Sequence, residues 1–268
     1  MPLTAQQIQA EAALLDEAER SVVQIRQSTS VHPDMTIDDA YAVQAAWREL
    51  KTGRGQELIG HKIGLTSRAM QQAMNITTPD SGFLTRDMVF DPNTEIAASR
   101  FTDLKIEMEL AFVLKHDLRG ADPTIDDVLD ATDHVTPAIE MIAARSFRTD
   151  PVTGRTRTVI DTIADNAADA GIITGGRAVG PREIDLRWAG AMLVKNGVVE
   201  ETGLAGGVLG HPANGIVWLA RRYFEHDMVL EAGQTILAGS FTRPLVVEPG
   251  DHFLADYGDL GSFEMPFV

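Results

Sequence analysis

Acidic side chains interrupt two apolar segments of the sequence. Residues 105–113 alternate between polar and apolar, so a β-strand here would place Glu107 and Glu109 about 6–7 Å apart on one face. Glu140 lies in a similarly apolar segment, residues 137–142. Burying an unpaired carboxylate is costly, and shared binding of a hard divalent cation such as Mg²⁺ or Mn²⁺ would explain all three acids. The alternative is a solvated strand face with no relation to Glu140, since charged side chains are usually exposed.

Two further residues are candidates for proton transfer. Lys62 lies in a short apolar segment with flanking glycines, residues 58–66, where it either extends to solvent or is desolvated. A desolvated lysine near a cation has a lowered pKa, which suits acid–base chemistry near neutral pH. Asp80 follows Pro79 in a turn-like segment, where Asp commonly makes local hydrogen bonds. Its alternative role is to pair with Lys62 or to position a water molecule.

Polar groups beside two other apolar segments are candidates for substrate contacts. Asn166 follows Asp165, and Ser240 and Arg243 lie in the segment 239–243. A guanidinium group is well suited to hold a substrate carboxylate, so either Arg243 or the arginines of residues 147–158 (Arg148, Arg155 and Arg157) are predicted to hold one. Both segments are equally compatible with turns. The seven histidines show no metal-ligand spacing, and the glycines of residues 171–180 form no dinucleotide-binding pattern.

The elements that must position these residues follow from capping pairs and from apolar periodicity. Thr4 with Gln7 and Thr36 with Asp39 have the spacing of capping boxes, each followed by a helical stripe. The predicted helices are residues 4–27, 36–51, 67–74, 124–133 and 212–224. A turn is predicted at residues 79–82. The predicted strands are residues 58–66, 88–90, 95–97, 105–113, 138–142 and 171–174, a hairpin at 191–200 with Asn-Gly at its turn, and further strands within 234–268.

This pattern predicts an α+β protein with a helical N-terminal segment, residues 1–55, and a catalytic domain, residues 56–268. Residues 147–158 are polar and basic, with Pro151 and Gly154, and are predicted to form a loop. The sequence leaves the mobility of this loop open.

Composition limits the classes of function. The formal net charge is −16, which disfavours a polyanionic partner such as nucleic acid. The absence of cysteine excludes disulfides and thiolate chemistry and fits a reducing cytoplasm. No run of residues is apolar enough for a membrane span, and the polar, acidic N-terminus does not have the pattern of a signal peptide. A small-molecule substrate is therefore expected, without nucleic acid or membrane partners.

Six short motifs occur together in one order. They are Gly60-His61-Lys62-Ile63-Gly64-Leu65-Thr66-Ser67, Thr78-Pro79-Asp80-Ser81-Gly82, Ile106-Glu107-Met108-Glu109-Leu110-Ala111, Pro137-Ala138-Ile139-Glu140, Asp165-Asn166-Ala167 and Leu209-Gly210-His211-Pro212. Each motif alone is weakly specific, but in this order they are highly specific and cover nearly the whole chain. The sequence resembles the hydratase/decarboxylase branch of the fumarylacetoacetate hydrolase superfamily.

The resemblance implies a mixed β-sandwich roll that carries the site, and a homo-oligomer, often a pentamer or decamer. By position, Glu107, Glu109 and Glu140 match the metal triad of the family, and Lys62 and Asp80 match its acid–base pair. The implied cofactor is Mg²⁺ or Mn²⁺.

The implied activity is addition of water to an unsaturated 2-oxo dicarboxylate in the catabolism of aromatic compounds. The alternatives are hydration of a shorter monoacid, decarboxylation of a related diacid, and a non-catalytic partner subunit. The last is disfavoured because a scaffold would not require the acids together with Lys62 and Asp80. No histidine matches the His/Glu dyad of the carbon–carbon bond hydrolases of the superfamily.

Overall fold

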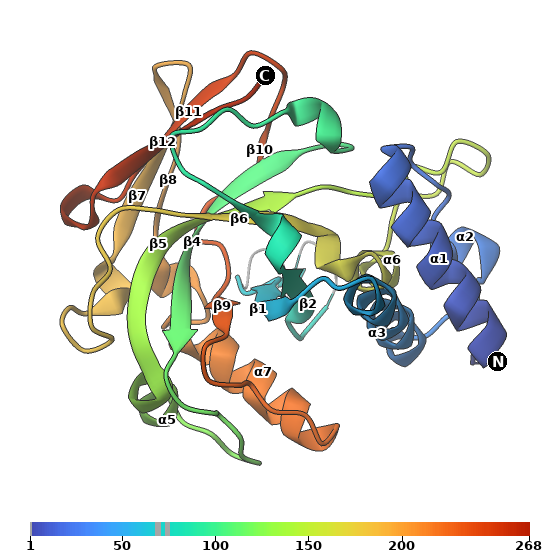
Figure 1. Ribbon diagram of the computed structural model, residues 1–268, viewed down its shortest axis with the longest axis horizontal. Helices are drawn as coiled ribbons and strands as arrows, with labels where there is room; N and C mark the ends of the chain where they lie inside the picture. The colour runs from blue at the N-terminus through green and yellow to red at the C-terminus, as the bar shows by residue number, and fades with distance from the viewer. Residues whose placement is uncertain (1, 68–70, 73–75) are drawn as a thin grey trace.

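Two β-sheets form the body of the protein, and the computed structural model describes residues 2–67, 71–72 and 76–268 (Figure 1). In this part of the chain the larger sheet has eight strands, in the order β2-β1-β9-β4-β5-β6-β3, with β10 also paired to β4. These strands are β1 (Leu58–Gly64), β2 (Asp80–Thr85), β3 (Val89–Phe90), β4 (Lys105–Leu114), β5 (Thr132–Ile142), β6 (Asp169–Thr174), β9 (Thr235–Leu237) and β10 (Leu245–Val246). Parallel and antiparallel pairs both occur, so the sheet is mixed.

The smaller sheet covers one face of the larger one. Its strands are β7 (Gly190–Lys195), β8 (Val198–Leu204), β11 (His252–Asp256) and β12 (Ser262–Pro266), in the order β12-β11-β7-β8. The main core joins apolar residues of both sheets, including Met108 and Phe112 from β4 and Leu193 and Phe253 from the smaller sheet. One face of β4 is therefore used for packing, which leaves its other face for the acidic residues.

The helices lie around the larger sheet, and α1, α3 and α6 gather on the side away from the smaller sheet (Figure 1). They are α1 (Ala5–Ser21), α2 (Ser28–Val31), α3 (Ile37–Gly53), α5 (Ile125–Ala131), α6 (Val159–Ala164) and α7 (Ala213–Glu225). The two predicted N-terminal capping boxes are present, at Thr4 and Thr36. Short 3₁₀ turns connect the elements: η1 (Arg86–Met88), η2 (Ala98–Arg100), η3 (Asn166–Ala168), η4 (Leu186–Trp188), η5 (Ala205–Gly207) and η6 (Gly258–Leu260).

The N-terminal helices share a core with the site-bearing part of the chain. Trp47 of α3 and Leu15 of α1 pack in one cluster with Phe83 of β2 and Ile163 of α6. The division at residue 55 stays a prediction, and this shared core means that the helical segment supports β2 and α6 directly.

Several predicted boundaries differ from the structure. The first helix ends at Ser21 rather than near residue 27, because Val22 takes a left-handed conformation and Ile25 instead pairs with Ser146. The turn predicted at residues 79–82 is largely the start of β2, since Asp80 pairs with Gly64 in an antiparallel ladder. Residues 95–97 make one isolated bridge, at Ile96, instead of a strand. The helix predicted for residues 67–74 lies largely outside the described residues.

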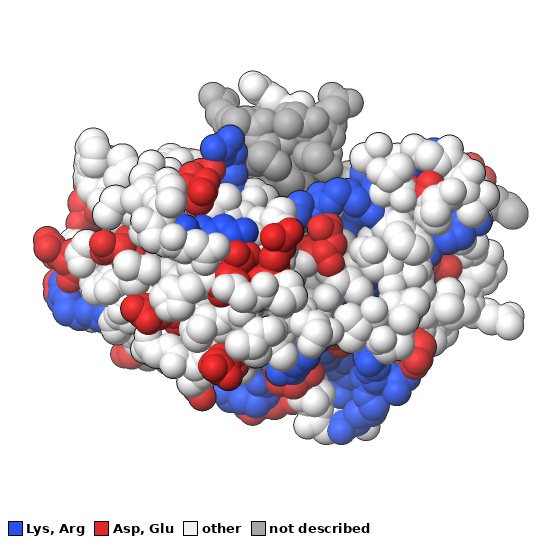
Figure 2. Space-filling model, turned by 90° about the horizontal axis from the view of Figure 1, so that it is seen from above, with Lys and Arg blue, Asp and Glu red and all other residues white. Residues whose placement is uncertain are grey.

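The surface charge and the helices of the described residues can be stated directly. Acidic and basic side chains are interspersed on the face shown in Figure 2. Each helix of residues 2–67, 71–72 and 76–268 is too short or too polar to cross a lipid bilayer.

Candidate active site

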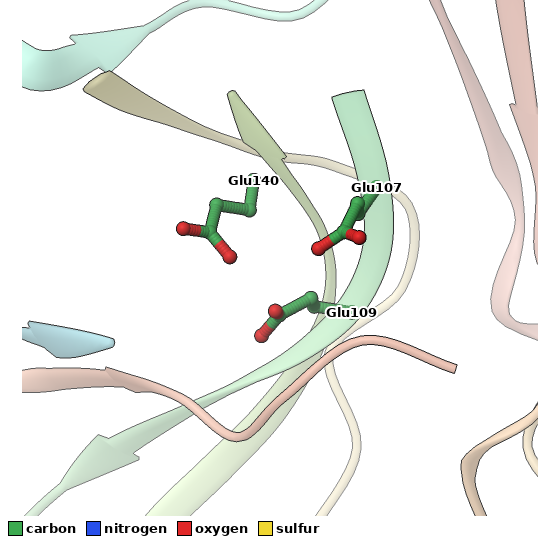
Figure 3. Close-up of side chains that lie close together, drawn as sticks. All are labelled: Glu107, Glu109 and Glu140. Carbon is green, nitrogen blue, oxygen red and sulfur yellow. The ribbon is translucent and has the colours of Figure 1, made fainter. Parts of the chain in front are cut away.

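The register between β4 and β5 brings the three glutamates together. Glu107 is the direct cross-strand partner of Glu140, and Glu109 follows two residues later on the same face of β4. One carboxylate oxygen from each of the three lies within 4.8 Å of the others. Figure 3 shows the three side chains directed toward a common space. The cluster predicted from the sequence is therefore present as a geometric unit.

The carboxylates are poorly satisfied by the described residues. Glu109 and Glu140 are buried, and Glu109 accepts a 2.8 Å hydrogen bond on Oε2 from the backbone N–H of Gly239. Oε1 of Glu109 and Oε1 of Glu140 make no hydrogen bond with the described residues. Burial and repulsion from Glu140 raise the pKa of Glu107 to about 8 and hold the pKa of Glu109 well above its ordinary value. A nearby positive charge would stabilise the ionised form of these carboxylates.

Lys62 supplies one such charge from β1. Its Nζ lies 3.2 Å from Oε1 of Glu140, and its side chain is only 5% exposed. Burial by itself lowers the pKa of Lys62, but attraction to Glu140 and Asp80 outweighs this, and the pKa lies above its ordinary value. Without a bound cation, the surrounding carboxylates therefore dominate over desolvation, and the lowered pKa expected beside a cation stays a prediction.

Asp80 lies at the first position of β2, against Gly64 of β1. Burial raises the pKa of Asp80, although the charge of Lys62 opposes this. A Cβ at residue 64 would lie 2.3 Å from Oδ1 of Asp80 and 2.9 Å from Nζ of Lys62. The two side chains therefore meet over the bare backbone of Gly64, as the pairing hypothesis for Asp80 requires.

The donor set fits a hard divalent cation. Three carboxylates converge from two adjacent strands; among the described residues, Oε1 of Glu109 has no partner and Oε1 of Glu140 has only the ion pair with Lys62. Oxygen-only sites of this kind suit Mg²⁺ or Mn²⁺, which keep coordination positions for water or substrate oxygens. We therefore assign Glu107, Glu109 and Glu140 as the residues that would hold the ion.

A fourth buried acid, Asp169, was not found by sequence reasoning. It opens β6, is fully buried, and its Oδ2 makes no hydrogen bond with the described residues. Burial and the charge of Glu140 raise the pKa of Asp169, while Lys62 opposes this. The one available signal was an aspartate between alanines at the start of an apolar strand, which has no specific spacing.

Asn166, predicted to bind substrate, has another partner in the structure. Its amide clamps Phe83 of β2, accepting from the backbone N–H at 2.8 Å and donating to the carbonyl at 2.9 Å. Asn166, Ala167 and Ala168 all have left-handed backbones, with φ of 51°, 51° and 63°. Each costs about 1–2 kcal/mol for a residue with a Cβ. This strained turn fixes β2, and with it the strand that carries Asp80.

The segment of residues 239–243 contributes backbone more than side chains. Ser240 Oγ donates to the carbonyls of Met108 and Thr242, one residue beyond the Gly239 N–H that binds Glu109. Arg243 is 81% exposed and forms an ion pair of 2.6 Å with Glu201. The structure therefore does not bring the Arg243 guanidinium to the glutamate cluster.

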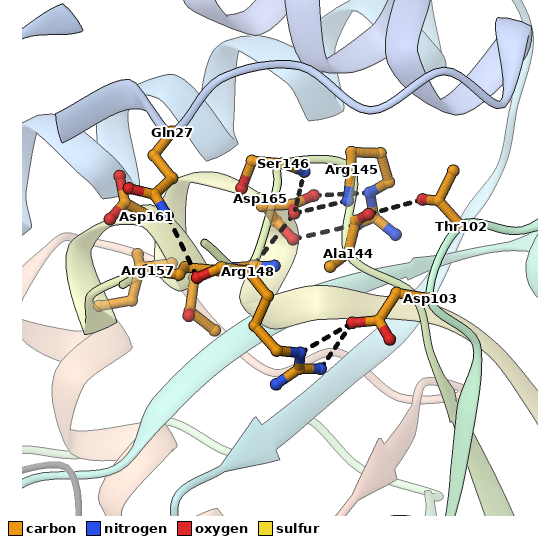
Figure 4. Close-up of polar contacts among 12 residues, drawn as sticks. Gln27, Thr102, Asp103, Ala144, Arg145, Ser146, Arg148, Arg157, Asp161 and Asp165 are labelled. Carbon is orange, nitrogen blue, oxygen red and sulfur yellow. Dashed lines mark hydrogen bonds and ion pairs between the residues drawn. The ribbon is translucent and has the colours of Figure 1, made fainter. Parts of the chain in front are cut away.

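A second polar network lies beside α6 and holds the basic loop of residues 147–158 (Figure 4). Asp165 accepts a 2.8 Å hydrogen bond from the backbone N–H of Arg145 and pairs with the guanidinium groups of Arg145 at 2.6 Å and Arg157 at 3.0 Å. Gln27 donates to the carbonyls of Phe147, Arg148 and Arg155. The loop is therefore built onto the N-terminal segment.

Fold and site together identify the class of protein. Residues 51–268 match the family described as "Fumarylacetoacetate (FAA) hydrolase C-terminal", and the chain belongs to this family.

Curated relatives and solved structures agree with this assignment. The chain is 53% identical over 257 residues to "2-oxo-hept-4-ene-1,7-dioate hydratase" of Escherichia coli, with 96% of each protein covered. It is 37% identical over 268 residues to "4-oxalocrotonate decarboxylase" of Pseudomonas sp. (strain CF600), covering 99% of this chain and 98% of the relative. The solved "4-oxalocrotonate decarboxylase from Pseudomonas putida G7 - complexed with magnesium and adipate" superposes with a TM-score of 0.94 at 36% identity, covering 99% of both chains.

Gly64 offers a test of the Lys62–Asp80 pair. Its backbone is one that any residue adopts, so alanine is excluded only by the two functional groups. We expect Gly64→Ala to displace them and to lower kcat by about 10²-fold, as misplacement of a catalytic group by about 1 Å does. The measurement is kcat together with thermal unfolding. Gly53→Ala, where no atom lies within 4 Å of the new Cβ, is the matched control. Equal kcat in both variants would remove the pair from the reaction.

Asn166→Ala separates clamping from substrate binding. The variant leaves the backbone N–H and carbonyl of Phe83 without partners, so we expect the free energy of unfolding to fall by about 2–4 kcal/mol. Urea denaturation measures this change. An unchanged stability with a raised KM would instead support the substrate-binding role predicted from the sequence.

Proposed function

We propose that this protein is a metal-dependent hydratase that adds water to 2-oxo-hept-4-ene-1,7-dioate and forms 4-hydroxy-2-oxoheptane-1,7-dioate. The observation that carries this proposal is the 53% identity to the hydratase of Escherichia coli over 96% of both chains. The acidic cluster, with Lys62 and Asp80 beside it, gives that likeness a chemical basis.

A divalent ion has a defined place in this proposal. When bound by the three glutamates, it supplies a Lewis acid toward the 2-oxo acid end of the substrate. The solved relative with a TM-score of 0.94 is complexed with magnesium, which supports the same ion here.

The side chains of Lys62 and Asp80 carry the proton transfers. One proton leaves C3 and one is delivered to C5, which moves the double bond from C4–C5 to C3–C4, in conjugation with the C2 ketone. Water then adds its oxygen at C4, and C3 takes up a proton. Because an ordinary lysine is protonated at neutral pH and Nζ of Lys62 lies 3.2 Å from the Glu140 carboxylate, we assign Lys62 as the first donor. Burial raises the pKa of Asp80, so its carboxylate is a stronger base than an ordinary one. We therefore assign Asp80 as the group that accepts the proton from C3.

Decarboxylation of 4-oxalocrotonate is the second candidate. It is favoured by the 0.94 TM-score and 36% identity to a solved decarboxylase. Hydration of a shorter monoacid is a third, since the chain is 36% identical over 265 residues to "2-keto-4-pentenoate hydratase" of Paraburkholderia xenovorans (strain LB400). All three reactions begin from an unsaturated 2-oxo acid.

A product assay by mass tests the proposal. The purified protein is incubated with Mg²⁺ and, separately, with the seven-carbon diacid, 4-oxalocrotonate and 2-hydroxypenta-2,4-dienoate. We expect the mass of water to be gained on the diacid with the highest kcat/KM. Loss of CO₂ from 4-oxalocrotonate as the faster reaction would assign the protein as a decarboxylase instead.

Removal of one metal ligand should remove the response to metal together with the activity. We expect Glu140→Ala to lower kcat/KM by about 10²-fold or more and to abolish the gain in activity on adding Mg²⁺. The measurement is a metal titration of the rate after chelation. Glu200→Ala, an exposed glutamate of β8, is the control. Full turnover by the wild-type protein after rigorous chelation would contradict the role of the cluster.

Assembly and location belong to the same proposal. The family resemblance supports a homo-oligomer, a pentamer or decamer, and the cysteine-free composition supports a cytoplasmic location. Light scattering on the purified protein measures the first.

A further inference from the structure

The basic loop of residues 147–158 and its surroundings contain several arginines, most of which already have partners. Arg148 is 57% exposed and pairs with Asp103 at 2.7 Å. Arg145 is buried, donates to the carbonyls of Asp165 and Asp169, and lies over the ring of Trp47. Neither guanidinium is available to a ligand without loss of these contacts.

Arg157 differs from both. Its side chain is only 8% exposed, and it makes one ion pair, 3.0 Å from Nη2 to Oδ2 of Asp165. Its Nε and Nη2 have no well-aligned hydrogen-bond acceptor among the described residues. A guanidinium carries five donors in a planar fork, so a buried arginine with so few contacts is a ready site for a carboxylate.

The charges around Arg157 form a buried cluster. The carboxylate of Asp165 is shared between Arg157 and Arg145. Asp161 adds a second negative charge nearby, and its oxygens accept hydrogen bonds from Thr29 and from Thr158. Burial lowers the pKa of Arg157, and attraction to Asp165 and Asp161 only partly opposes this.

Arg157 and the acid–base pair are connected through the strained turn. Asp165, the partner of Arg157, directly precedes Asn166, whose amide clamps Phe83 of β2. The backbone carbonyl oxygen of Asn166 would lie 2.5 Å from a Cβ built on Gly82. The left-handed turn of residues 166–168 therefore packs directly against β2. The charge of Arg157 is also felt at Asp80, where it lowers the pKa against the effect of burial.

We propose that Arg157 binds the distal carboxylate of the substrate and so selects a diacid over a monoacid. This inference rests on the proposed function. An ion bound by the glutamates would engage the 2-oxo acid end, Lys62 and Asp80 would act at the middle carbons, and Arg157 would contact the distal carboxylate. Of the arginines predicted for this role, the structure favours Arg157, which is buried, over Arg243, which is 81% exposed.

The N-terminal segment fixes the geometry of this contact. Gln27 holds three carbonyls of the loop, Arg26 pairs with Asp150 at 2.9 Å, and Thr29 binds Asp161 at the start of α6. Arg157 lies between these anchors. A guanidinium placed by a built loop loses little freedom on binding, which favours discrimination between substrates.

Substrate discrimination tests the proposal. Rates are measured for the seven-carbon diacid and for 2-hydroxypenta-2,4-dienoate with Arg157→Ala, Arg157→Lys, Arg148→Ala and Arg243→Ala. We expect Arg157→Ala to raise the KM of the diacid by about 10²-fold, as loss of a charge-assisted contact does, and to change the KM of the monoacid far less. Arg157→Lys should recover part of this loss. Arg148→Ala, from the same loop but paired with Asp103 on the surface, is the matched control.

Equal losses on both substrates, or a selective loss in Arg243→Ala alone, would overturn the proposal. Arg157→Gln replaces the alanine variant if circular dichroism shows that the latter does not fold.

Binding distinguishes failure of this inference from failure of the proposed function. Calorimetry in the presence of Mg²⁺ compares adipate with hexanoate, which has the same chain length but one carboxylate. A preference for adipate that disappears in Arg157→Ala supports the proposal even if the seven-carbon diacid is not turned over. The same preference in wild type and variant rejects it even if hydration is confirmed.

Discussion

Repulsion among three carboxylates on one face of the β4–β5 ladder is the constraint on which the site depends. Like charges directly opposite one another destabilise a sheet, and here Glu107 faces Glu140 with Glu109 beside them. Within the described residues, the ammonium group of Lys62 forms an ion pair with one of the three, Glu140. The remaining negative charge makes the native chain a better ligand for a divalent cation than any unfolded chain, so ion binding and folding stabilise each other.

A second constraint operates on the other side of β2. The left-handed turn of η3 is unfavourable by itself, and such strain persists only where surrounding bonds determine the backbone. Those bonds are the Asn166 clamp on Phe83 and the pairing of Asp165 with two arginines. The same contacts therefore hold β2 in place and keep the basic loop close to it. A substitution that breaks one of these contacts should therefore affect both the stability of the protein and the position of β2.

The sequence predicted the elements well but predicted orientation poorly. Alternation along residues 105–113 was sufficient to predict β4 and its acidic face, because side-chain direction in a strand has a period of two. The opposition of Glu107 and Glu140 depends on long-range register, which no local pattern specifies. The directions of Asn166 and Arg243 depend on a left-handed turn and on a surface ion pair, so their contacts could not be predicted. Asp169 belongs to no motif with a recognisable spacing, so the sequence did not identify it as a buried acid.

Gln27, in the N-terminal segment, holds the basic loop of residues 147–158 through three backbone carbonyls. The glutamates, Lys62 and Asp80 all lie within residues 51–268, the part that matches the family. The loop lies there too, but its anchors at Arg26, Gln27 and Thr29 precede it in the chain. On the proposed role of Arg157, substitutions at these three anchors would alter which substrates are accepted without removing a metal ligand. Substitutions at Leu15 or Trp47, which pack against Phe83 of β2, would reach the strand of Asp80 as well. The N-terminal segment can thus affect substrate choice and catalysis through separate residues.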